Sequence, residues 1–193
     1  MTKTKLKLEG KRIILRKLKL SDVLDIYKNL QDKEMVRWTL SIPWPYKKQN
    51  AVKFIKRTHY AIRKKSGYAF GIVLKETNKV IGLVDISHID WKNKNAELGY
   101  WLGKKYWGRG YTTEAVKLIL RFAFEKLKLH RVYANLFEEN IASRRVLEKT
   151  GFRLEGTTRE SRYRYNKWHN ELRFGILKQE YEKLSKKQAV SRG

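Results

Sequence analysis

Alternating apolar and polar residues predict seven β-strands in this chain of 193 residues. The first is expected at residues 12–18, where Ile13 and Leu15 share one face. Two apolar runs, 68–74 and 80–89, are joined by a turn-rich segment and predict an antiparallel hairpin. The other strands are expected at residues 95–102, 131–137, 157–165 and 168–178, with β character already from Phe152.

Helical periodicity appears between the first strand and the hairpin. Ser21 is a suitable N-cap for a helix whose apolar stripe would comprise Val23, Leu24, Tyr27 and Leu30. Residues 41–46 contain two prolines and should be extended. A longer helix is expected at 47–65, with its inner side formed by Ala51, Phe54, Ile55, Thr58 and Ile62.

Two more helices are predicted in the second half of the chain. In residues 112–128 one charged stripe contrasts with an apolar remainder, which predicts a well-buried helix. Its charged positions are Glu114, Lys117, Arg121, Glu125 and Lys128, and its apolar positions are Ala115, Leu118, Ile119, Phe122, Ala123 and Phe124. A shorter helix is expected at 140–150, ended by Gly151 at the C′ position.

The order of these elements is strand, two helices, three strands, helix, strand, helix and two strands. Such an order predicts an α+β fold. The length fits one domain over residues 1–193, without an internal repeat or linker. The tail from about residue 179 is expected to be frayed, or helical at its start.

The composition describes a folded chain with a strongly basic surface. Hydrophobic residues make up 41% and aromatic residues 12%, which is too much for a disordered chain. The 45 Lys and Arg against 19 Asp and Glu give a net charge of +26, and such a field attracts polyanions. Contact with RNA, a ribosome, an acidic protein or an anionic cofactor is one interpretation. A Lys-rich surface that reflects only composition is the other.

Several kinds of site are excluded by missing residue types. The chain has no cysteine, which excludes disulfides, a cysteine nucleophile and thiolate metal sites. Its four histidines are far apart in sequence, so no metal is expected. No run approaches the roughly 18 apolar residues that span a bilayer. The expected location is therefore cytoplasmic, and the expected state a monomer or homodimer.

A glycine-containing loop separates the strand that ends at Leu102 from the helix that opens at Thr112. Gly103, Gly108 and Gly110 would let the main chain approach a ligand closely. Free N–H groups at the helix start make an anion site. On these residues alone, an ordinary strand-to-helix turn is an equal alternative.

The surrounding residues resemble the GNAT acetyltransferase superfamily. Lys105-Tyr-Trp-Gly108-Arg-Gly110-Tyr-Thr-Thr-Glu-Ala115 resembles its acetyl-CoA loop, with Lys105 where Gln or Arg is usual. Asn140-Ile-Ala-Ser143 and Leu147-Glu-Lys-Thr-Gly151-Phe152 resemble its second half. The opening Leu8-Glu-Gly10-Lys-Arg-Ile-Ile-Leu-Arg16 is similar to the Rim-type branch, which acetylates the N-termini of ribosomal proteins.

This resemblance implies a mixed, mostly antiparallel sheet of about six to seven strands flanked by helices. The sheet should splay between the strands before and after the cofactor-binding helix. Acetyl-CoA is the implied co-substrate, without a metal. The implied cofactor-binding residues are Trp101, Leu102, Lys105, Trp107, Gly108, Arg109, Gly110, Tyr111, Thr112, Asn140 and Ser143.

Two residues are the candidates for proton transfer. Glu97 could take the amine proton directly or through water, with a salt-bridged strand glutamate as the alternative. Many members of the family use a tyrosine at the position of Leu147, which cannot donate a proton, so Ser143 is the candidate acid. Asn140 could cap its helix or contact pantetheine. His88 and His130 are weaker candidates for a base.

Three functions fit these features. The leading one is acetylation of a protein N-terminus, because a positive field repels polycationic acceptors. The second is acetylation of a small-molecule amine. The third is an RNA- or ribosome-binding module with little catalysis, suggested by the interleaved basic and aromatic residues 159–168. That stretch would equally suit a hairpin with one basic face and one aromatic core face.

Overall fold

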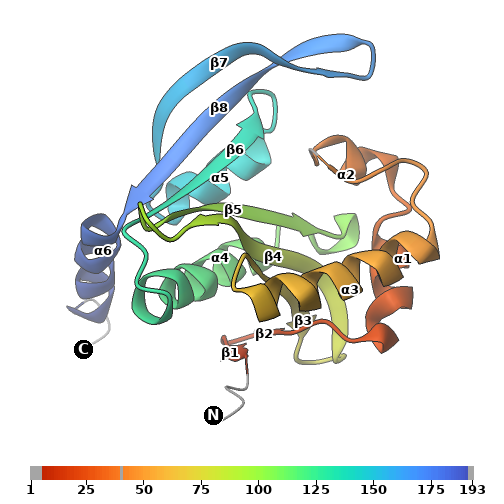
Figure 1. Ribbon diagram of the computed structural model, residues 1–193, viewed down its shortest axis with the longest axis horizontal. Helices are drawn as coiled ribbons and strands as arrows, with labels where there is room; N and C mark the ends of the chain where they lie inside the picture. Colours follow the sequence, from red (N-terminus) through yellow and green to blue (C-terminus); the bar gives the residue numbers. More distant parts are fainter. Residues whose placement is uncertain (1–5, 40, 191–193) are drawn as a thin grey trace. The chain divides into compact units, whose positions relative to one another are not determined.

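The computed structural model describes residues 6–39 and 41–190 (Figure 1). Within them the chain forms eight strands and six α-helices, with three short segments of 3-10 or π-helix. The strands are β1 (Lys7–Glu9), β2 (Ile13–Arg16), β3 (Tyr68–Leu74), β4 (Lys79–Asp90), β5 (Asn95–Leu102), β6 (Arg131–Phe137), β7 (Arg153–Arg164) and β8 (Lys167–Leu177). The helices are α1 (Val23–Asn29), α2 (Lys33–Arg37), α3 (Lys48–Lys64), α4 (Tyr111–Arg121), α5 (Ile141–Lys149) and α6 (Lys178–Val190).

The strands have the order β1-β2-β3-β4-β5-β6-β8-β7 in one sheet. Strands β1 to β4 pair antiparallel, as do β6 with β8 and β8 with β7. The pairing of β5 with β6 is parallel and covers three residue pairs, from Asn95 with Arg131 to Glu97 with Tyr133. The predicted α+β class and mostly antiparallel sheet are confirmed, and the short register of β5 with β6 agrees with the predicted splay.

The chain divides into two compact units. The first comprises the described part of residues 1–88 together with 99–119, and the second comprises 89–98 and the described part of 120–193. The expectation of one domain remains a prediction.

The core of the first unit lies between its strands and α3. Ile13 and Leu15 of β2 are buried, as the alternation predicted. Helices α1 and α3 lie side by side (Figure 1). The inner face of α3 buries Ala51, Ile55 and Thr58, as its periodicity predicted, because these positions recur at helical spacing.

The start of α1 differs from the prediction that Ser21 caps it. A 3-10 turn, η1 (Leu20–Asp22), precedes the helix. The carboxylate of Asp22 accepts a hydrogen bond from the backbone N–H of Lys19 at 2.7 Å and pairs with Arg16. Leu24, which was predicted to face inward, is 47% exposed. The ion pair between Asp22 and Arg16 stabilises this turn. Helix α1 therefore begins at Val23, one residue later than a cap at Ser21 would place it.

In the second unit the helical segment after Ile119 is buried as predicted. A π-helical stretch, η3 (Phe122–Lys126), follows α4, and Phe122, Ala123 and Phe124 are buried there. Strands β7 and β8 form a long hairpin (Figure 1), and β7 begins at Arg153, earlier than the predicted residue 157. The start of the tail is helical.

Two elements, β1 and α2, were not predicted, and a third, β7, begins before residue 157, for two different reasons. Strand β1 has three residues and α2 has five, and both are too short to show a period. The register of β7 shifts between Leu154 and Gly156, which interrupts its alternation. Such irregularities explain the higher strand count.

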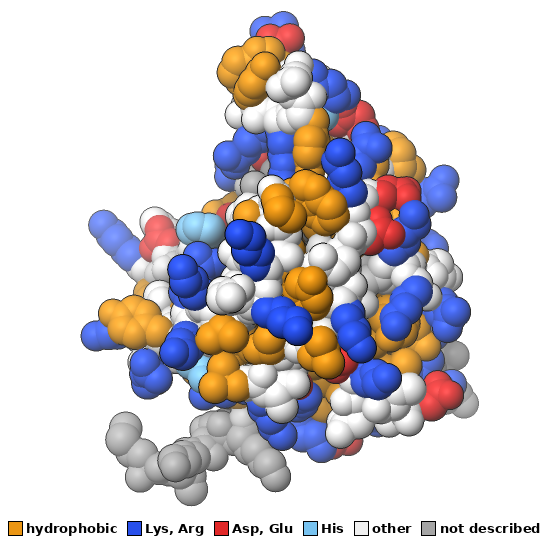
Figure 2. Space-filling view, turned by 90° about the vertical axis from the view of Figure 1, so that its right-hand side faces the viewer, with side chains coloured by type: hydrophobic (Ala, Val, Ile, Leu, Met, Phe, Trp, Pro, Cys, Tyr) orange, Lys and Arg blue, Asp and Glu red, His pale blue; other side chains and the backbone are white. Residues whose placement is uncertain are grey.

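Positive charge is widespread on the surface. Figure 2 shows Lys and Arg side chains scattered over the face it draws, with fewer acidic ones between them. No helix in the described part of the chain is both long and apolar enough to cross a bilayer.

Candidate functional site

The loop between β5 and α4 requires two of its glycines. Gly108 has φ of 72° and Gly110 has φ of 75°, and both values lie in the left-handed region that side chains disfavour. A β-carbon at Gly108 would meet nothing within 4 Å, so conformation alone demands glycine there. The backbone therefore turns sharply twice before the helix begins at Tyr111.

The start of α4 is open to a ligand. The N–H of Glu114 donates to the carbonyl of Gly110 at 3.1 Å, which is the first bond of the helical pattern. The N–H groups of Tyr111, Thr112 and Thr113 precede that bond and have no carbonyl one turn earlier in the helix. Gly110 has no side chain that could cap them. The positive end of the helix dipole adds to their affinity for an anion such as a pyrophosphate.

Arg12 connects this loop to the turn before β2. Its Nη1 donates to the carbonyl of Arg109 at 2.7 Å, and its Nε donates to Oε2 of Glu114 at 3.0 Å. The guanidinium also lies over the ring of Tyr111, 4.7 Å from its centroid. One side chain thus contacts the loop and the first turn of α4 at three points.

Glu114 completes this arrangement. Its Oε1 accepts the backbone N–H of Arg12 at 2.8 Å and that of Ile13 at 3.4 Å. A β-carbon on Gly10 would lie 2.5 Å from the same oxygen, so glycine leaves room for the carboxylate. The prediction that Glu114 belongs to a solvated stripe was wrong, because its side chain is only 16% exposed. We name Arg12 and Glu114 the Arg12–Glu114 clamp.

The other predicted cofactor residues on this side are held in different ways. The indole N–H of Trp107 donates to the carbonyl of Leu102 at 2.7 Å. The side chains of Trp101 and Leu102 are buried, so only their backbone groups could meet a ligand. Arg109 is exposed and is bound to the clamp through its carbonyl.

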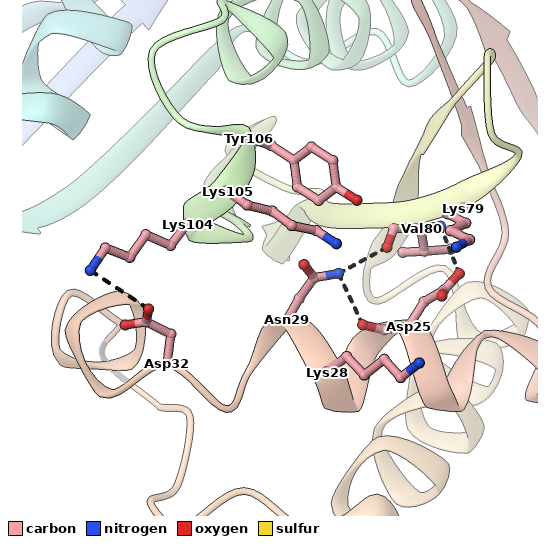
Figure 3. Close-up of a pocket in the computed structure, with 9 residues that line it drawn as sticks. All are labelled: Asp25, Lys28, Asn29, Asp32, Lys79, Val80, Lys104, Lys105 and Tyr106. Carbon is pink, nitrogen blue, oxygen red and sulfur yellow. Dashed lines mark hydrogen bonds and ion pairs between the residues drawn. The ribbon is translucent and has the colours of Figure 1, made fainter.

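Lys105 lines a pocket formed by α1, the start of β4 and the 3-10 turn η2 (Lys104–Tyr106), which follows Gly103 (Figure 3). Its ammonium group lies 5.0 Å from the ring centroid of Tyr106. The neighbouring Lys104 pairs with Glu34 and, at 3.7 Å, with Asp32. The hydrogen bond that the Lys104 ammonium donates to the Glu34 carboxylate is the main cause that raises the pKa of Lys104. The pocket combines lysines with aspartates, so it has no uniform charge.

Glu97 belongs to the second unit, where it lies opposite Tyr133 in the parallel pairing of β5 and β6. Its Oε1 accepts a hydrogen bond from Nδ2 of Asn135 at 3.1 Å, and Oδ1 of Asn135 accepts one from Arg173 at 3.3 Å. The guanidinium groups of Arg131 and Arg173 lie 5.1 and 4.9 Å from the ring centroid of Tyr133. Burial raises the pKa of Tyr133, and the charge of Glu97 adds to that shift. The glutamate thus lies in a polar cluster that could also orient it.

Asn140 and Ser143 are brought together at the start of α5. Oδ1 of Asn140 accepts the N–H of Ser143 at 3.1 Å, so the predicted N-cap is confirmed. Two N–H donors of the amide are left for other contacts. Leu147 is 1% exposed, and Gly151 ends the helix with φ of 93°.

The histidines do not form a site of their own. His130 is exposed, and His88 lies at a positive φ of 49°. In the part of the chain that the structure describes, no three His, Asp or Glu side chains lie close enough to hold a metal ion.

Comparisons with known proteins show the family of this chain. Residues 12–153 match the acetyltransferase (GNAT) domain family. The uncharacterized N-acetyltransferase p20 of Bacillus licheniformis is 31% identical over 170 residues, which cover 88% of this chain and 95% of that protein. The ribosomal-protein-S5-alanine acetyltransferase of Vibrio fischeri shares the fold with a TM-score of 0.82 at 22% identity, covering 91% of this chain and 98% of that one.

Two enzymes of Escherichia coli (strain K12) match with equal identity. The ribosomal-protein-serine acetyltransferase is 28% identical over 97 residues, 50% of this chain and 54% of that enzyme. The spermidine N(1)-acetyltransferase is 28% identical over 100 residues, 52% of this chain and 54% of that enzyme.

The chain belongs to the GNAT acetyltransferase family, as its sequence predicted. As a member of this family it is an acetyl-CoA-dependent N-acetyltransferase, with acetyl-CoA as its co-substrate.

The sequence did not reveal the Arg12–Glu114 clamp or the contact of Glu97 with Asn135. Glu114 lies 102 residues from Arg12, and Asn135 lies 38 residues from Glu97. The Gly-x-Arg pattern at residues 10–12, between β1 and β2, was the only local signal for the clamp.

Proposed function

We propose that this acetyltransferase acts on the α-amine of protein N-termini in the cytoplasm, where acetyl-CoA and new protein chains occur together. The open start of α4, preceded by Gly108 and Gly110 in left-handed conformations, is the observation that carries the cofactor part of this proposal. Its N–H groups bind the pyrophosphate of acetyl-CoA. Lys105, Trp107, Arg109, Tyr111 and Thr112 surround the cofactor there, together with backbone groups of Trp101 and Leu102.

The acceptor attacks in a ternary complex. The neutral amine adds to the thioester carbonyl, a C–N bond forms, and the C–S bond then breaks. Glu97 takes the amine proton directly or through one water. Ser143 donates a proton to the departing sulfur, and Asn140 holds pantetheine with the amide N–H groups that capping leaves over.

Charge favours a peptide acceptor over a polyamine. A net charge of +26 slows the approach of a polycation unless carboxylates gather at the acceptor site. The acidic side chains that could serve are already engaged. Asp90 accepts from Asn93, Glu138 from Asn170, and Glu139 from Lys167 and His169.

A direct test offers two acceptors under identical conditions. The purified protein and acetyl-CoA are incubated with a synthetic ribosomal-protein N-terminal peptide or with spermidine, and released thiol and acetylated product are measured. We expect transfer to the peptide at least about tenfold faster. The same peptide with a blocked N-terminus and an internal lysine should be inert. Faster transfer to spermidine would refute the acceptor assignment.

The two proton-transfer roles are tested with conservative variants. Glu97→Gln and Ser143→Ala should each lower kcat about 10²-fold, in line with loss of a base or an acid, and the affinity of Glu97→Gln for free CoA should stay nearly constant. Ser66→Ala, at an exposed position after α3, is the matched control. A kcat within twofold of wild type in either variant contradicts that role.

A further inference from the structure

Among the helices, α3 carries the highest net positive charge. Between residues 47 and 65 there are eight Lys and Arg and no Asp or Glu. The acid-free stretch extends from residue 35 to residue 75. Local repulsion of this kind destabilises a helix unless something compensates it.

The charges share one face of α3. Five basic side chains and Tyr60 follow each other at spacings of three and four residues, which places them on one stripe. All are exposed, and they are Lys53, Lys56, Arg57, Tyr60, Arg63 and Lys64. The opposite side buries Ala51, Ile55 and Thr58. At 1.5 Å per residue the stripe is about 16 Å long. We name it the α3 stripe.

The stripe is not neutralised by the protein itself. In the described part of the chain, its five cations make no ion pair with a carboxylate. Arg63 and Lys64 instead lie 5.9 Å from the ring centroid of Tyr60, and Arg57 lies 5.7 Å from that of Phe54. Tyr60 is 54% exposed at the centre of the stripe.

The hairpin of β7 and β8 provides the contrast. Its residues 159–168 have a similar basic and aromatic composition. However, Arg162 pairs with Glu171 at 2.9 Å, and Lys167 pairs with Glu139 at 3.1 Å. Two of its cations are therefore already compensated, and the α3 stripe is the stronger candidate for a polyanion.

We propose that the α3 stripe binds the phosphate backbone of single-stranded RNA. A row of cations that follows the backbone, with an aromatic ring on which a base stacks, is the usual arrangement for such ligands. Tyr60 supplies the ring. A membrane surface is disfavoured because an interfacial helix inserts its apolar face into lipid, and here that face is in the core. An acidic protein would offer no planar base to Tyr60.

The test compares two variants that each lose five positive charges. The first replaces Lys53, Lys56, Arg57, Arg63 and Lys64 by Gln. The control replaces the exposed Lys92, Lys117, Lys126, Lys183 and Lys186 by Gln. Gln resembles Lys and Arg in helix propensity, so both variants should fold. Circular dichroism and the affinity for free CoA verify this, and neither readout involves RNA.

The probe is a fluorescein-labelled 20-nucleotide oligouridine, and the readout is anisotropy between 50 and 300 mM salt. Each phosphate contact on a single strand contributes about 0.7 to the magnitude of the slope of log K against log salt, so loss of five contacts should lower that magnitude by about 3.5 in the stripe variant. Its affinity should fall at least tenfold. The control variant should keep most of the RNA affinity and most of the salt dependence. Tyr60→Ala should weaken RNA binding without changing the slope, because it removes a stacking ring and no charge.

Four results would overturn the proposal. One is equal loss in the stripe and control variants, since net charge alone would then explain binding. Another is RNA binding by the stripe variant at wild-type strength. The third is binding of phosphatidylglycerol vesicles or polyglutamate as tight as that of RNA and equally dependent on the stripe. Acetyl transfer without RNA binding also refutes it, and leaves the proposed function intact.

Discussion

Two helices of this protein begin in opposite ways. Helix α5 is closed by its own sequence, because Asn140 caps the N–H of Ser143. Helix α4 begins after Gly110, which has no side chain to offer, and it is supported from outside by Arg12, which binds Glu114 of the first turn and the carbonyl of Arg109. A capped start contributes stability, whereas an uncapped start keeps its donors for a ligand. The difference supports the proposal that the start of α4 binds the pyrophosphate of acetyl-CoA.

The clamp resolves a conflict at α4. Glu114 brings a negative charge to the first turn, where it suits the helix dipole but would repel a phosphate. Arg12 pairs with that charge and binds the carbonyl of Arg109. The loop is thereby fixed without occupying the N–H groups at the helix start. We expect the clamp to position the loop rather than to touch the reacting atoms.

The largest effect is expected when the open start is distorted. In Gly110→Val a β-branched residue would have to adopt φ of 75°, at a cost of about 1–3 kcal/mol, with its β-carbon 3.4 Å from Arg12 Nη2. Calorimetry should show CoA binding weakened about 100-fold, or about 2.7 kcal/mol. Gly156→Ala is the control, because its β-carbon would meet nothing within 4 Å. Unchanged binding in Gly110→Val would remove this loop from the cofactor site.

A smaller effect is expected when the clamp is weakened. Glu114→Gln keeps the size of the side chain but loses charge-assisted hydrogen bonds worth about 1.5–3 kcal/mol each, part of which the amide recovers. The KM for acetyl-CoA should rise about tenfold, corresponding to about 1.4 kcal/mol. Turnover of S-acetylpantetheine, which lacks the pyrophosphate, should change less than twofold.

That pair of acyl donors separates positioning from general damage. If Glu114→Gln slows both donors equally, the clamp is only structural. Glu76→Gln in the exposed turn after β3 is the matched control and should leave both donors unaffected.

A substitution at the capped start of α5 should affect mainly the stability of the protein. Asn140→Ala removes the cap and should lower the free energy of unfolding by about 1 kcal/mol in a urea titration. Asn140→Ser keeps a capping oxygen and should recover most of that loss. Because serine lacks the amide N–H donors, the affinity of Asn140→Ser for CoA should remain about threefold weaker than that of the wild type. If Asn140→Ser recovers both the stability and the CoA affinity of the wild type, the role of Asn140 is limited to capping the helix.

The smallest effect at neutral pH is expected for a substitution of Tyr46, which tests whether core stability and cofactor binding are separable. Burial raises the pKa of Tyr46 to about 12, and this side chain is only 6% exposed in the core of the first unit. The pKa of Tyr46 is higher in the folded state than its value of about 10 in the unfolded state. The contribution of neutral Tyr46 to the free energy of unfolding is therefore complete below pH 10 and is lost as the pH rises to about 12. The loss should be on the order of 2–3 kcal/mol.

Tyr46→Phe has no proton to lose and should flatten that alkaline decline relative to wild type. Thermal unfolding between pH 8 and 11.5 measures the difference between the two proteins. CoA affinity at pH 7.5 should be equal in both. A change in affinity would mean that core stability also influences the open start of α4, and would weaken the comparison.

The sequence by itself determined most of the elements and the position of the loop between β5 and α4. Helical spacing identified the buried side of α3, and the two glycines around Arg109 have the positive φ values that favour glycine. Asn140 was predicted as an N-cap and is one. These features depend on residues within one or two turns of each other, so their period and type are visible along the chain.

Only the tertiary structure decided which polar groups have partners. Arg12 and Glu114 are 102 residues apart and meet because β2 lies next to the start of α4. The carboxylate of Glu171 neutralises Arg162 on the hairpin, while no acidic side chain in the described chain pairs with the α3 stripe. Hydrophobic periodicity specifies which face is buried, but the pairing of charges far apart in sequence depends on how those faces pack.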